Sequence, residues 1–275
     1  MLNQEQTDFF LIKAYNAAVR AGARVLDIFT GHKRAQDSQD AVRVTPLTLA
    51  DAASHELIKS YLAQTRIPML SAEGRDLLYQ ERCNWDLFWM VDPLDGTKEF
   101  VRGNGEFTIN IALMCENRPL IGFIYVPYLH KLYFAVRGRG AYLKTDLLPR
   151  EDFEAELGQL WEGNRTLPLR EGANDPVRIA ISRSHNTPET FDYVERLRQQ
   201  YPGAEVVEQG SSYKFCLLAE ASVDTYVRTS NTYEWDTAAG TIPISCAKIN
   251  ICRRGTPANV LYLCGRNRLK LNLWT

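Results

Sequence analysis

The sequence predicts a layered α/β sandwich, with helices on a largely antiparallel sheet in the first half and a smaller α/β unit in the second. Three observations support this fold class. Residues 8–29 and 49–63 repeat apolar side chains at helical spacing. Residues 107–113 alternate apolar and other side chains, as on one face of a strand. From residue 178 onward strand-like and helix-like segments alternate, which is typical of an α/β unit.

Each element follows from a local pattern. Residues 32–46, between the first two helices, are polar and irregular, and we expect them to form a mobile loop. Short apolar runs then predict strands at 68–70, 87–91, 107–113, 120–126, 132–136 and 141–143. In the second half we expect strands at 178–182, 205–208 and 223–227, with helices at 187–199 and 211–220. The polar segment between the halves is interpreted as a linker or an elaborated edge, which divides the chain into 1–145, 146–175 and 176–275.

The composition excludes several classes of protein. The net charge is −1, with 32 basic and 33 acidic residues, so nucleic acid is not indicated as a partner. None of the six cysteines forms a C-x-x-C pair, so neither a zinc site nor a redox motif is indicated. Residues 1–8 do not resemble a signal peptide, and no apolar run is long enough to span a bilayer. We expect a reduced, cytoplasmic protein, whose oligomeric state the sequence does not predict.

Acidic residues cluster where apolar segments end. Asp92 and Asp95 follow LFWMV directly, Glu73 follows a short apolar run, and Asp236 stands in NTYEWDTAAG. Two carboxylates so close repel each other, and a cation such as Mg²⁺ offsets that repulsion. Each cluster alone has a plainer interpretation. DPLDG can be a turn, Glu73 can lie in a solvated loop, and Asp236 can be a helix N-cap.

The order of the motifs resembles a known family. DPLDGT (92–97), followed far downstream by WDTAAG (235–240), resembles the inositol monophosphatase-like, lithium-sensitive, Mg²⁺-dependent phosphatases. Four further motifs resemble one branch of that family, the 3′(2′),5′-bisphosphate nucleotidases of the CysQ type: LTLAD (47–51), NGEFTINIAL (104–113), SRSH (182–185) and GSSYKFC (210–216). The resemblance is dense over about residues 46–145 and 178–240, and it implies the family's fold and a place in sulfur assimilation.

The resemblance implies a catalytic centre with two or three Mg²⁺ ions in the first half of the chain. Thr97 would orient the attacking water, and Asp51 would accept its proton. The backbone N–H groups of Gly96 and Thr97 would begin a helix and hold phosphate oxygens. The metal ligands would be the carboxylates of Glu73, Asp92, Asp95 and Asp236 and the backbone carbonyl of Leu94.

The resemblance also implies that the second half recognises the rest of a nucleotide. The phosphate that is not cleaved, and the base, would meet His185, Ser211, Lys214 and Arg228. Without the family, other interpretations stay open for these residues. His185 can cap a helix, and the lysine and the arginine can be solvated surface charges.

The sequence departs from the family pattern at three places. Ala72 stands where the family has the first glutamate of Ser-Glu-Glu, which is a metal ligand, and a methyl group cannot bind Mg²⁺. Activity should therefore be weak unless Glu73 takes over, and the alternatives are an impaired natural member or a deliberately disabled variant. Arg43 stands where the branch tends to carry an acid. After WDTAAG, Pro243 and β-branched residues replace the small residues expected of a helix that packs on the sheet.

These inferences predict a Mg²⁺-dependent phosphomonoesterase that converts adenosine 3′,5′-bisphosphate to AMP and phosphate by direct attack of water. The sulfated nucleotide PAPS is a second candidate substrate. One alternative is an inositol monophosphatase or sugar bisphosphatase of the same fold, which has less need for Lys214. Another is a catalytically dead nucleotide-binding protein, because of Ala72. A purely structural protein would leave the acidic clusters unexplained.

Overall fold

A computed structural model describes the chain except for residues 1, 37–44, 75–76, 247–248, 255–260 and 267–275. The helices are α1 Gln4–Gln36, α2 Pro46–Leu62, α3 Tyr79–Arg82, α4 Thr97–Arg102, α5 Leu157–Trp161, α6 Pro188–Gln200, α7 Tyr213–Glu220 and α8 Glu234–Cys246. The first seven strands are β1 Met69–Ser71, β2 Leu87–Asp95, β3 Thr108–Cys115, β4 Arg118–Val126, β5 Lys131–Val136, β6 Gly140–Lys144 and β7 Arg165–Thr166. The others are β8 Arg178–Ser182, β9 Glu205–Gln209, β10 Thr225–Arg228, β11 Ile249–Arg254 and β12 Leu261–Arg266.

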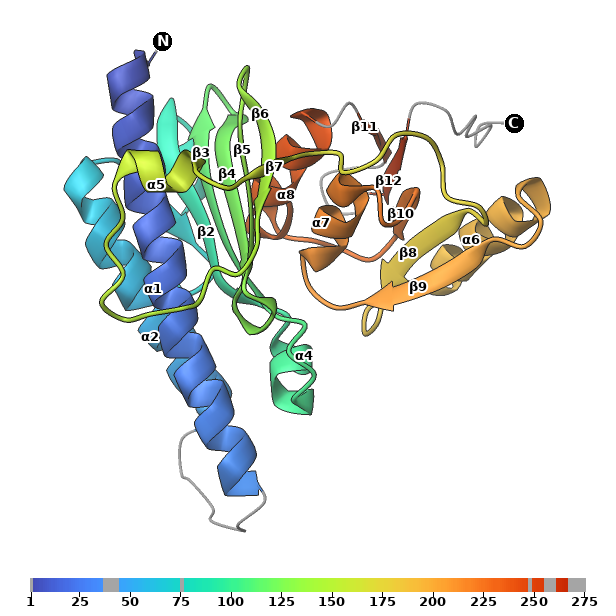
Figure 1. The fold of residues 1–275 in the computed structure, drawn as a ribbon, viewed down its shortest axis with the longest axis horizontal. Helices are drawn as coiled ribbons and strands as arrows, with labels where there is room; N and C mark the ends of the chain where they lie inside the picture. Colours follow the sequence, from blue (N-terminus) through green and yellow to red (C-terminus); the bar gives the residue numbers. More distant parts are fainter. Residues whose placement is uncertain (1, 37–44, 75–76, 247–248, 255–260, 267–275) are drawn as a thin grey trace.

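The first sheet lies between two layers of helices (Figure 1). Its seven strands follow chain order; β1 and β2 are parallel and the remaining pairs are antiparallel. Side chains alternate between its faces, so Trp89 and Val91 pack with α1 and α2, whereas Phe88 and Met90 pack with α7 and α8. This arrangement confirms the predicted layered sandwich with a largely antiparallel first sheet.

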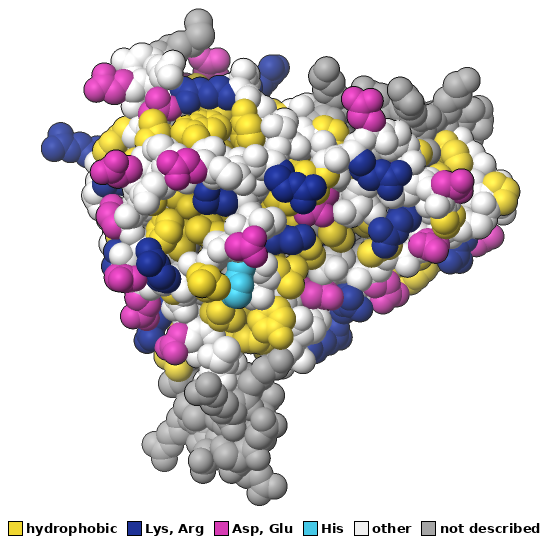
Figure 2. All heavy atoms as spheres, in the orientation of Figure 1, with side chains coloured by type: hydrophobic (Ala, Val, Ile, Leu, Met, Phe, Trp, Pro, Cys, Tyr) yellow, Lys and Arg dark blue, Asp and Glu magenta, His cyan; other side chains and the backbone are white. Residues whose placement is uncertain are grey.

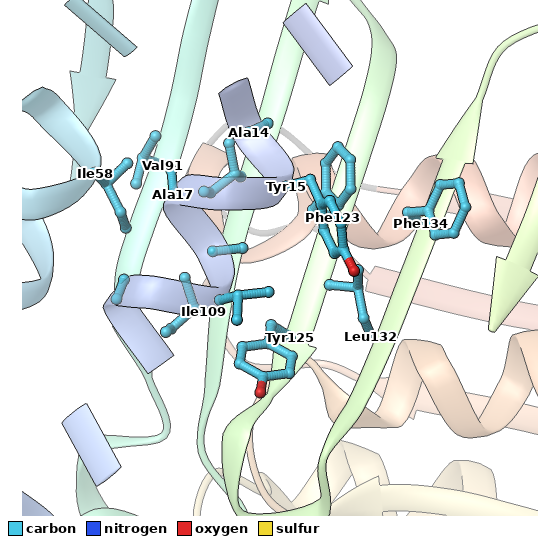
Figure 3. Packing of buried hydrophobic residues seen from close by; sticks show 14 of the residues in the cluster. Ala14, Tyr15, Ala17, Ile58, Val91, Ile109, Phe123, Tyr125, Leu132 and Phe134 are labelled. Atoms are coloured by element: carbon cyan, nitrogen blue, oxygen red, sulfur yellow. The ribbon is translucent and has the colours of Figure 1, made fainter. Parts of the chain in front are cut away.

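Small residues allow helices to approach this sheet closely. Figure 3 shows Ala14 and Ala17 of α1 directed at the side chains of the sheet. A Cβ atom at Gly22 would lie 2.3 Å from the Tyr125 ring, so the helix could not pack here with a larger residue. On the other face, a Cβ at Gly122 of β4 would lie 2.6 Å from the carbonyl oxygen of Ala239 in α8.

The second sheet places its functional loops at one edge. Its strand order is β11-β12-β10-β8-β9, and β10, β8 and β9 are parallel neighbours. The carboxyl ends of parallel strands lie at the same edge of a sheet, so the residues after Ser182, after Gln209 and at Arg228 gather there. A separate core under α6, which includes Ile179, Val194 and Leu197, holds this unit together.

One expectation about the helices needs correction. α1 continues through Gly31 to Gln36, although we expected a loop from residue 32. Glycine inside a helix costs about 1 kcal/mol relative to alanine, which a helix of 33 residues tolerates. The rest of the expected loop, with Arg43, lies mostly outside the described residues. α8 forms despite Pro243, and Ile242, Pro243 and Ile244 are buried.

The surface shows no dominant sign of charge on the face in Figure 2, where acidic and basic side chains of the described residues are interspersed. Among the helices in the described ranges, none combines the length and apolar character needed to cross a bilayer.

Candidate active site

One cavity of about 420 Å³ brings together residues from both halves of the chain. The residues that the sequence singled out all line it, although up to 185 positions separate them (Asp51 to Asp236). They are Asp51, Glu73, Asp92, Leu94, Asp95, Gly96, Thr97, His185, Ser211, Lys214, Arg228 and Asp236. The first sheet and α2 supply one side, and the carboxyl ends of β8–β10 supply the other.

The DPLDG segment forms the floor of the cavity at the end of β2. Asp92 pairs with Asn110 and Asp95 pairs with Thr108 on β3, with an irregularity between the two pairs. The bulge that this creates re-aims side chains at the end of a strand. The side chain of Leu94 is anchored in the first hydrophobic core. The segment can therefore present its polar groups to the cavity.

Gly96 is required by the backbone at this turn. Its φ is +92°, and a Cβ would lie 3.0 Å from both the carbonyl oxygen of Glu106 and the Cβ of Ser211. α4 begins immediately afterwards at Thr97, as the sequence analysis expected. The predicted phosphate contacts of these two N–H groups stay a prediction.

Helix α2 braces the floor through residues on one of its faces. Asp51, Ser54 and His55 lie at i, i+3 and i+4 and are all buried. The hydroxyl of Ser54 donates to the carbonyl oxygen of Pro93 at 2.8 Å. Nδ1 of His55 is 2.9 Å from the hydroxyl of Ser71, which opens the loop that contains Ala72 and Glu73.

The cavity is lined by four aspartates, which we call the acidic wall: Asp51, Asp92, Asp95 and Asp236. Burial raises the pKa of Asp92 well above its ordinary value, and Asp95, Asp236 and Asp51 raise it further. Burial and then Asp95 raise the pKa of Asp236 to about 6. Burial and then Glu73 raise the pKa of Asp51 to about 7. Such a group of acids is costly to ionise unless a cation offsets the charge.

The hydrogen bonds of the acidic wall leave oxygens that a cation could use. Oδ1 of Asp92 accepts the N–H of Leu94 at 3.2 Å, and Oδ2 of Asp95 accepts the N–H of Ser212 at 2.5 Å. Oδ2 of Asp236 accepts the N–H of Tyr233 at 3.3 Å. The second oxygen of each carboxylate has no hydrogen-bond partner among the described residues, and oxygen ligands fit Mg²⁺. Within those residues, no three Asp, Glu, His or Cys side chains stand in the arrangement of a metal cluster.

The loop at Ala72 lacks the ligand that the family pattern places there. The N–H of Ala72 donates to the carbonyl oxygen of Val91 at 3.1 Å, so its backbone is tied to β2. Its side chain adds only a methyl group to the cavity lining. Glu73 also lines the cavity, is exposed and raises the pKa of Asp51, so its charge acts on the acidic wall.

The opposite side of the cavity, the cationic wall, is formed by Lys214 and Arg228, with His185 beside them. Burial, and then Lys98 and Arg228, lower the pKa of His185, which favours its neutral ring. Lys214 is only 2% exposed, which contradicts the interpretation as a solvated charge. Its Nζ donates to the carbonyl oxygens of Gln209 at 3.0 Å and Ser211 at 2.6 Å, and burial lowers its pKa to about 8. Arg228 lies 3.5 Å from Asp236, where the two walls meet.

The N-cap of α6 is Thr187, so the interpretation of His185 as a helix cap is excluded. α8 begins at Glu234, so Asp236 lies in the first turn, from which it accepts the N–H of Tyr233 just before the helix. Asp51 and Thr97 both line the cavity, but no hydrogen bond joins them within the described part of the chain. Their proton relay stays a prediction.

The structure adds residues that the sequence analysis did not select. Glu99, Ser182, Asn231 and Tyr233 line the cavity as well. Glu99 is 2% exposed and accepts the hydroxyl of Ser184 at 2.7 Å. Its position in DGTKEF was the available signal, but the sequence gives no sign that this acid is buried.

A second cavity of about 450 Å³ lies elsewhere along α8 and has different chemistry. Phe88, Met90 and Met114 contribute apolar side chains to it, and its charged residues Arg82 and Glu234 already pair with each other at 2.8 Å. It lacks the convergent aspartates of the first cavity, so the first is the candidate active site.

Comparisons with known proteins indicate the family of this chain. A family model described as "Inositol monophosphatase family" matches residues 6–245. The chain is 35% identical over 230 residues to the 3′(2′),5′-bisphosphate nucleotidase CysQ of Salmonella typhimurium, covering 81% of this chain and 82% of that protein. It is 34% identical over 225 residues to the protein of that name from Escherichia coli K12, with the same coverage.

Solved structures give the same result. The crystal structure of CysQ from Bacteroides thetaiotaomicron, described as a bacterial member of the inositol monophosphatase family, has a TM-score of 0.83 and 37% identity. The match covers 96% of this chain and 99% of that one. An inositol monophosphatase from Zymomonas mobilis shares the fold at a TM-score of 0.70 and 18% identity, over 98% of this chain and 96% of that one. The chain belongs to the inositol monophosphatase family.

Proposed function

We propose that this protein is a Mg²⁺-dependent phosphatase that hydrolyses adenosine 3′,5′-bisphosphate to AMP and phosphate. The observation that carries the proposal is the pairing of an acidic wall with a buried cationic wall in one cavity. A phosphomonoesterase that cleaves one phosphate and recognises another needs both. The 35% identity to a 3′(2′),5′-bisphosphate nucleotidase supports the same substrate class.

Asp92, Asp95, Asp236 and the carbonyl of Leu94 would hold the cations, with Glu73 as an additional candidate. Bound Mg²⁺ would supply Lewis-acid stabilisation of the phosphate and of the leaving oxygen. Thr97 would orient a water for in-line attack, and Asp51 would accept its proton. Since the pKa of Asp51 is raised to about 7, it can take up a proton near neutral pH.

The cationic wall would bind the phosphate that is not cleaved. Lys214 uses two of its three N–H groups on the carbonyls of Gln209 and Ser211, which leaves one donor for a phosphate oxygen. A buried ammonium group with no carboxylate in hydrogen-bond contact favours an anionic ligand. An inositol monophosphate has no second phosphate for this ammonium group, so a bisphosphate is favoured over an inositol phosphate. The identity to a 3′(2′),5′-bisphosphate nucleotidase favours a nucleotide over a sugar bisphosphate.

Because of Ala72, how fast the protein hydrolyses its substrate has to be considered separately from which substrate it uses. We propose that the protein is active but weaker than a member with a glutamate at this position, because Glu73 adds charge but is exposed. Ala72→Glu should raise Mg²⁺ affinity by about tenfold or more, since affinity follows the number of charged oxygen ligands. A matched control is Ala63→Glu, which adds the same charge at an exposed position outside the cavity.

The test is phosphate release from adenosine 3′,5′-bisphosphate, inositol 1-phosphate and fructose 1,6-bisphosphate, measured with wild type, Ala72→Glu and Ala63→Glu. The proposal expects the nucleotide to have the highest kcat/KM and Ala72→Glu to increase it. Preference for inositol phosphate would overturn the substrate assignment. Tight nucleotide binding without turnover in both wild type and Ala72→Glu would instead identify a binding protein.

A further inference from the structure

The two halves of the molecule meet directly at a candidate metal ligand. Oδ2 of Asp95 accepts the backbone N–H of Ser212, which precedes α7 in the second half, at 2.5 Å. This bond fixes one carboxylate oxygen and leaves Oδ1 for a cation. The orientation of Asp95 therefore depends on where the Ser212 backbone lies.

The side chain of Ser212 is in turn fixed by the first sheet. Its hydroxyl donates to Oδ1 of Asn110 at 2.7 Å and lies 2.7 Å from the hydroxyl of Thr108, which can donate to it. Thr108 and Asn110 are two residues apart on β3, so they share one face. They are also the cross-strand partners of Asp95 and Asp92. A single serine thus contacts the side chains of the two β3 residues that pair with both aspartates.

This group of hydroxyls and an amide is fully enclosed. Thr108, Asn110 and Ser212 are 0%, 1% and 3% exposed. Buried polar groups hold their geometry firmly, because losing a partner leaves a desolvated donor or acceptor. Nδ2 of Asn110 has no partner among the described residues, so the network includes an uncompensated donor that stability alone does not favour.

The segment that Ser212 anchors is also the segment that would bind phosphate. Ser211 lines the cavity with a φ of +48°, and Lys214 is tied to the carbonyls of Gln209 and Ser211. Residues 209–214 are therefore a braced unit. This unit carries both the phosphate contacts and the N–H that orients Asp95, so a phosphate bound to it acts on the same backbone that holds the carboxylate.

We propose that Thr108, Asn110 and Ser212 are positioning residues that couple the phosphate-recognition segment to the cation site, so that nucleotide and cation each strengthen binding of the other. The coupling is reciprocal, as thermodynamic linkage requires. This inference rests on the proposed function, because it takes Asp95 as a cation ligand and Lys214 as a phosphate contact.

The test measures Mn²⁺ affinity by electron paramagnetic resonance, with and without saturating AMP, in the full chain. Mn²⁺ favours the same oxygen ligands as Mg²⁺ and has a direct spectroscopic signal. In wild type, AMP should tighten Mn²⁺ binding about fivefold or more. In Ser212→Ala, which keeps the backbone N–H but loses both hydroxyl contacts, the AMP effect should fall below about twofold. Affinity for AMP without metal should stay within about threefold of wild type.

A second pair of variants separates coupling from loss of folding. Thr108→Val keeps the shape but removes the hydroxyl, and should behave like Ser212→Ala; Thr108→Ser keeps the hydroxyl and should restore the coupling. Thr190→Val is the matched control: Thr190 is also fully buried and hydroxyl-bonded, but to Thr229 rather than to Ser212. Its coupling should equal that of wild type.

The outcomes distinguish this inference from the proposed function. If wild type binds both Mn²⁺ and AMP without mutual effect, or if Ser212→Ala and Thr108→Val keep the full AMP effect, the coupling is refuted while the phosphatase assignment stands. If wild type binds neither AMP nor adenosine 3′,5′-bisphosphate, the proposed substrate class fails first, and the coupling with it.

Discussion

The two walls of the cavity carry opposite charges but are built by different means. The acidic wall comes mainly from the end of β2 and from α2, and its carboxylates accept backbone N–H groups that fix their orientation. The cationic wall comes from loops at the carboxyl ends of parallel strands, and Lys214 donates to backbone carbonyls. Each wall is costly to keep charged on its own. The difference indicates a division of roles, with chemistry at the acidic wall and recognition at the cationic wall.

The largest expected effect tests the acidic wall. Asp95→Asn should lower kcat by about 1,000-fold or more, because cation stabilisation of the transition state is worth several kcal/mol. If the new side chain turns its oxygen to the N–H of Ser212, its NH₂ group faces the cation. If it turns the other way, two donors face each other. Steady-state kinetics at saturating Mg²⁺ and a metal titration together check this prediction.

Asp86→Asn is the matched control for that variant. Asp86 is exposed and immediately precedes β2, at the end of the strand opposite Asp95. It should keep wild-type activity within about twofold, since exposed charges contribute little. Equal activity of Asp95→Asn and Asp86→Asn would mean that the acidic wall does not hold the metal.

Much of the fold follows from local patterns. Alternation in residues 107–113 predicted β3 and the shared burial of Phe107, Ile109, Ile111 and Leu113 in one core, which the structure confirms. Elements with weak patterns were missed: α5 and β7 lie in a polar segment, and β7 exists only through its pairing with β6. The end of α1 was misplaced because Gly31 looks like a helix stop, although nothing in the local packing requires one.

The site shows the same limit more sharply. The order of the motifs indicated the residues that gather in the cavity, because short segments such as DPLDG and WDTAAG each contain cavity residues within a few positions. The sequence did not indicate which residues fix the position of these cavity residues through hydrogen bonds. Ser212 and Asn110 are 102 positions apart, and Ser54 and Pro93 are 39 apart. Their contacts depend on strand register and on the docking of the two halves, which no local pattern encodes.

A smaller effect should mark the cationic wall. Lys214→Met should lower kcat/KM for adenosine 3′,5′-bisphosphate about ten- to a hundredfold more than for adenosine 3′-monophosphate. The reason is that a charge-assisted contact to the second phosphate is worth about 1.5–3 kcal/mol, and only the bisphosphate makes it. The variant also removes the donor for the carbonyls of Gln209 and Ser211. That structural loss affects both substrates, so the ratio between them isolates the charge.

Lys98→Met provides the comparison for Lys214→Met. Lys98 is exposed on α4, and its Nζ reaches the carbonyl oxygen of Ser184 at 3.5 Å, beside the cavity rather than in its lining. A solvent-screened charge should change the substrate ratio by less than about threefold. If both lysine variants shift the ratio equally, recognition is a diffuse electrostatic effect and Lys214 has no special contact.

The smallest expected effect is on how the folding stability of the ligand-free protein depends on pH. The acidic wall should lower this stability as pH rises through one range, and the cationic wall should raise it through a higher range. Asp51 has a folded pKa raised to about 7, so its ionisation opposes folding. That penalty is absent below about pH 4, grows between about pH 4 and 7, and is constant above. Lys214 has a folded pKa lowered to about 8, so its penalty is full below that pH and disappears as pH rises toward about 10.5.

Urea unfolding at a series of pH values tests these two ranges by difference. Between pH 4 and 7, the free energy of unfolding of wild type, relative to that of Asp51→Asn, should fall by up to about 1.4 kcal/mol per pH unit. Between pH 8 and 10.5, the free energy of unfolding of wild type, relative to that of Lys214→Met, should rise with a similar maximum slope. Mg²⁺ should flatten the first difference because a cation stabilises the ionised acid, and AMP should flatten the second because a phosphate stabilises the ammonium group. If the plots of unfolding free energy against pH are parallel for wild type and both variants, neither Asp51 nor Lys214 destabilises the ligand-free protein by being charged, and the prediction is wrong.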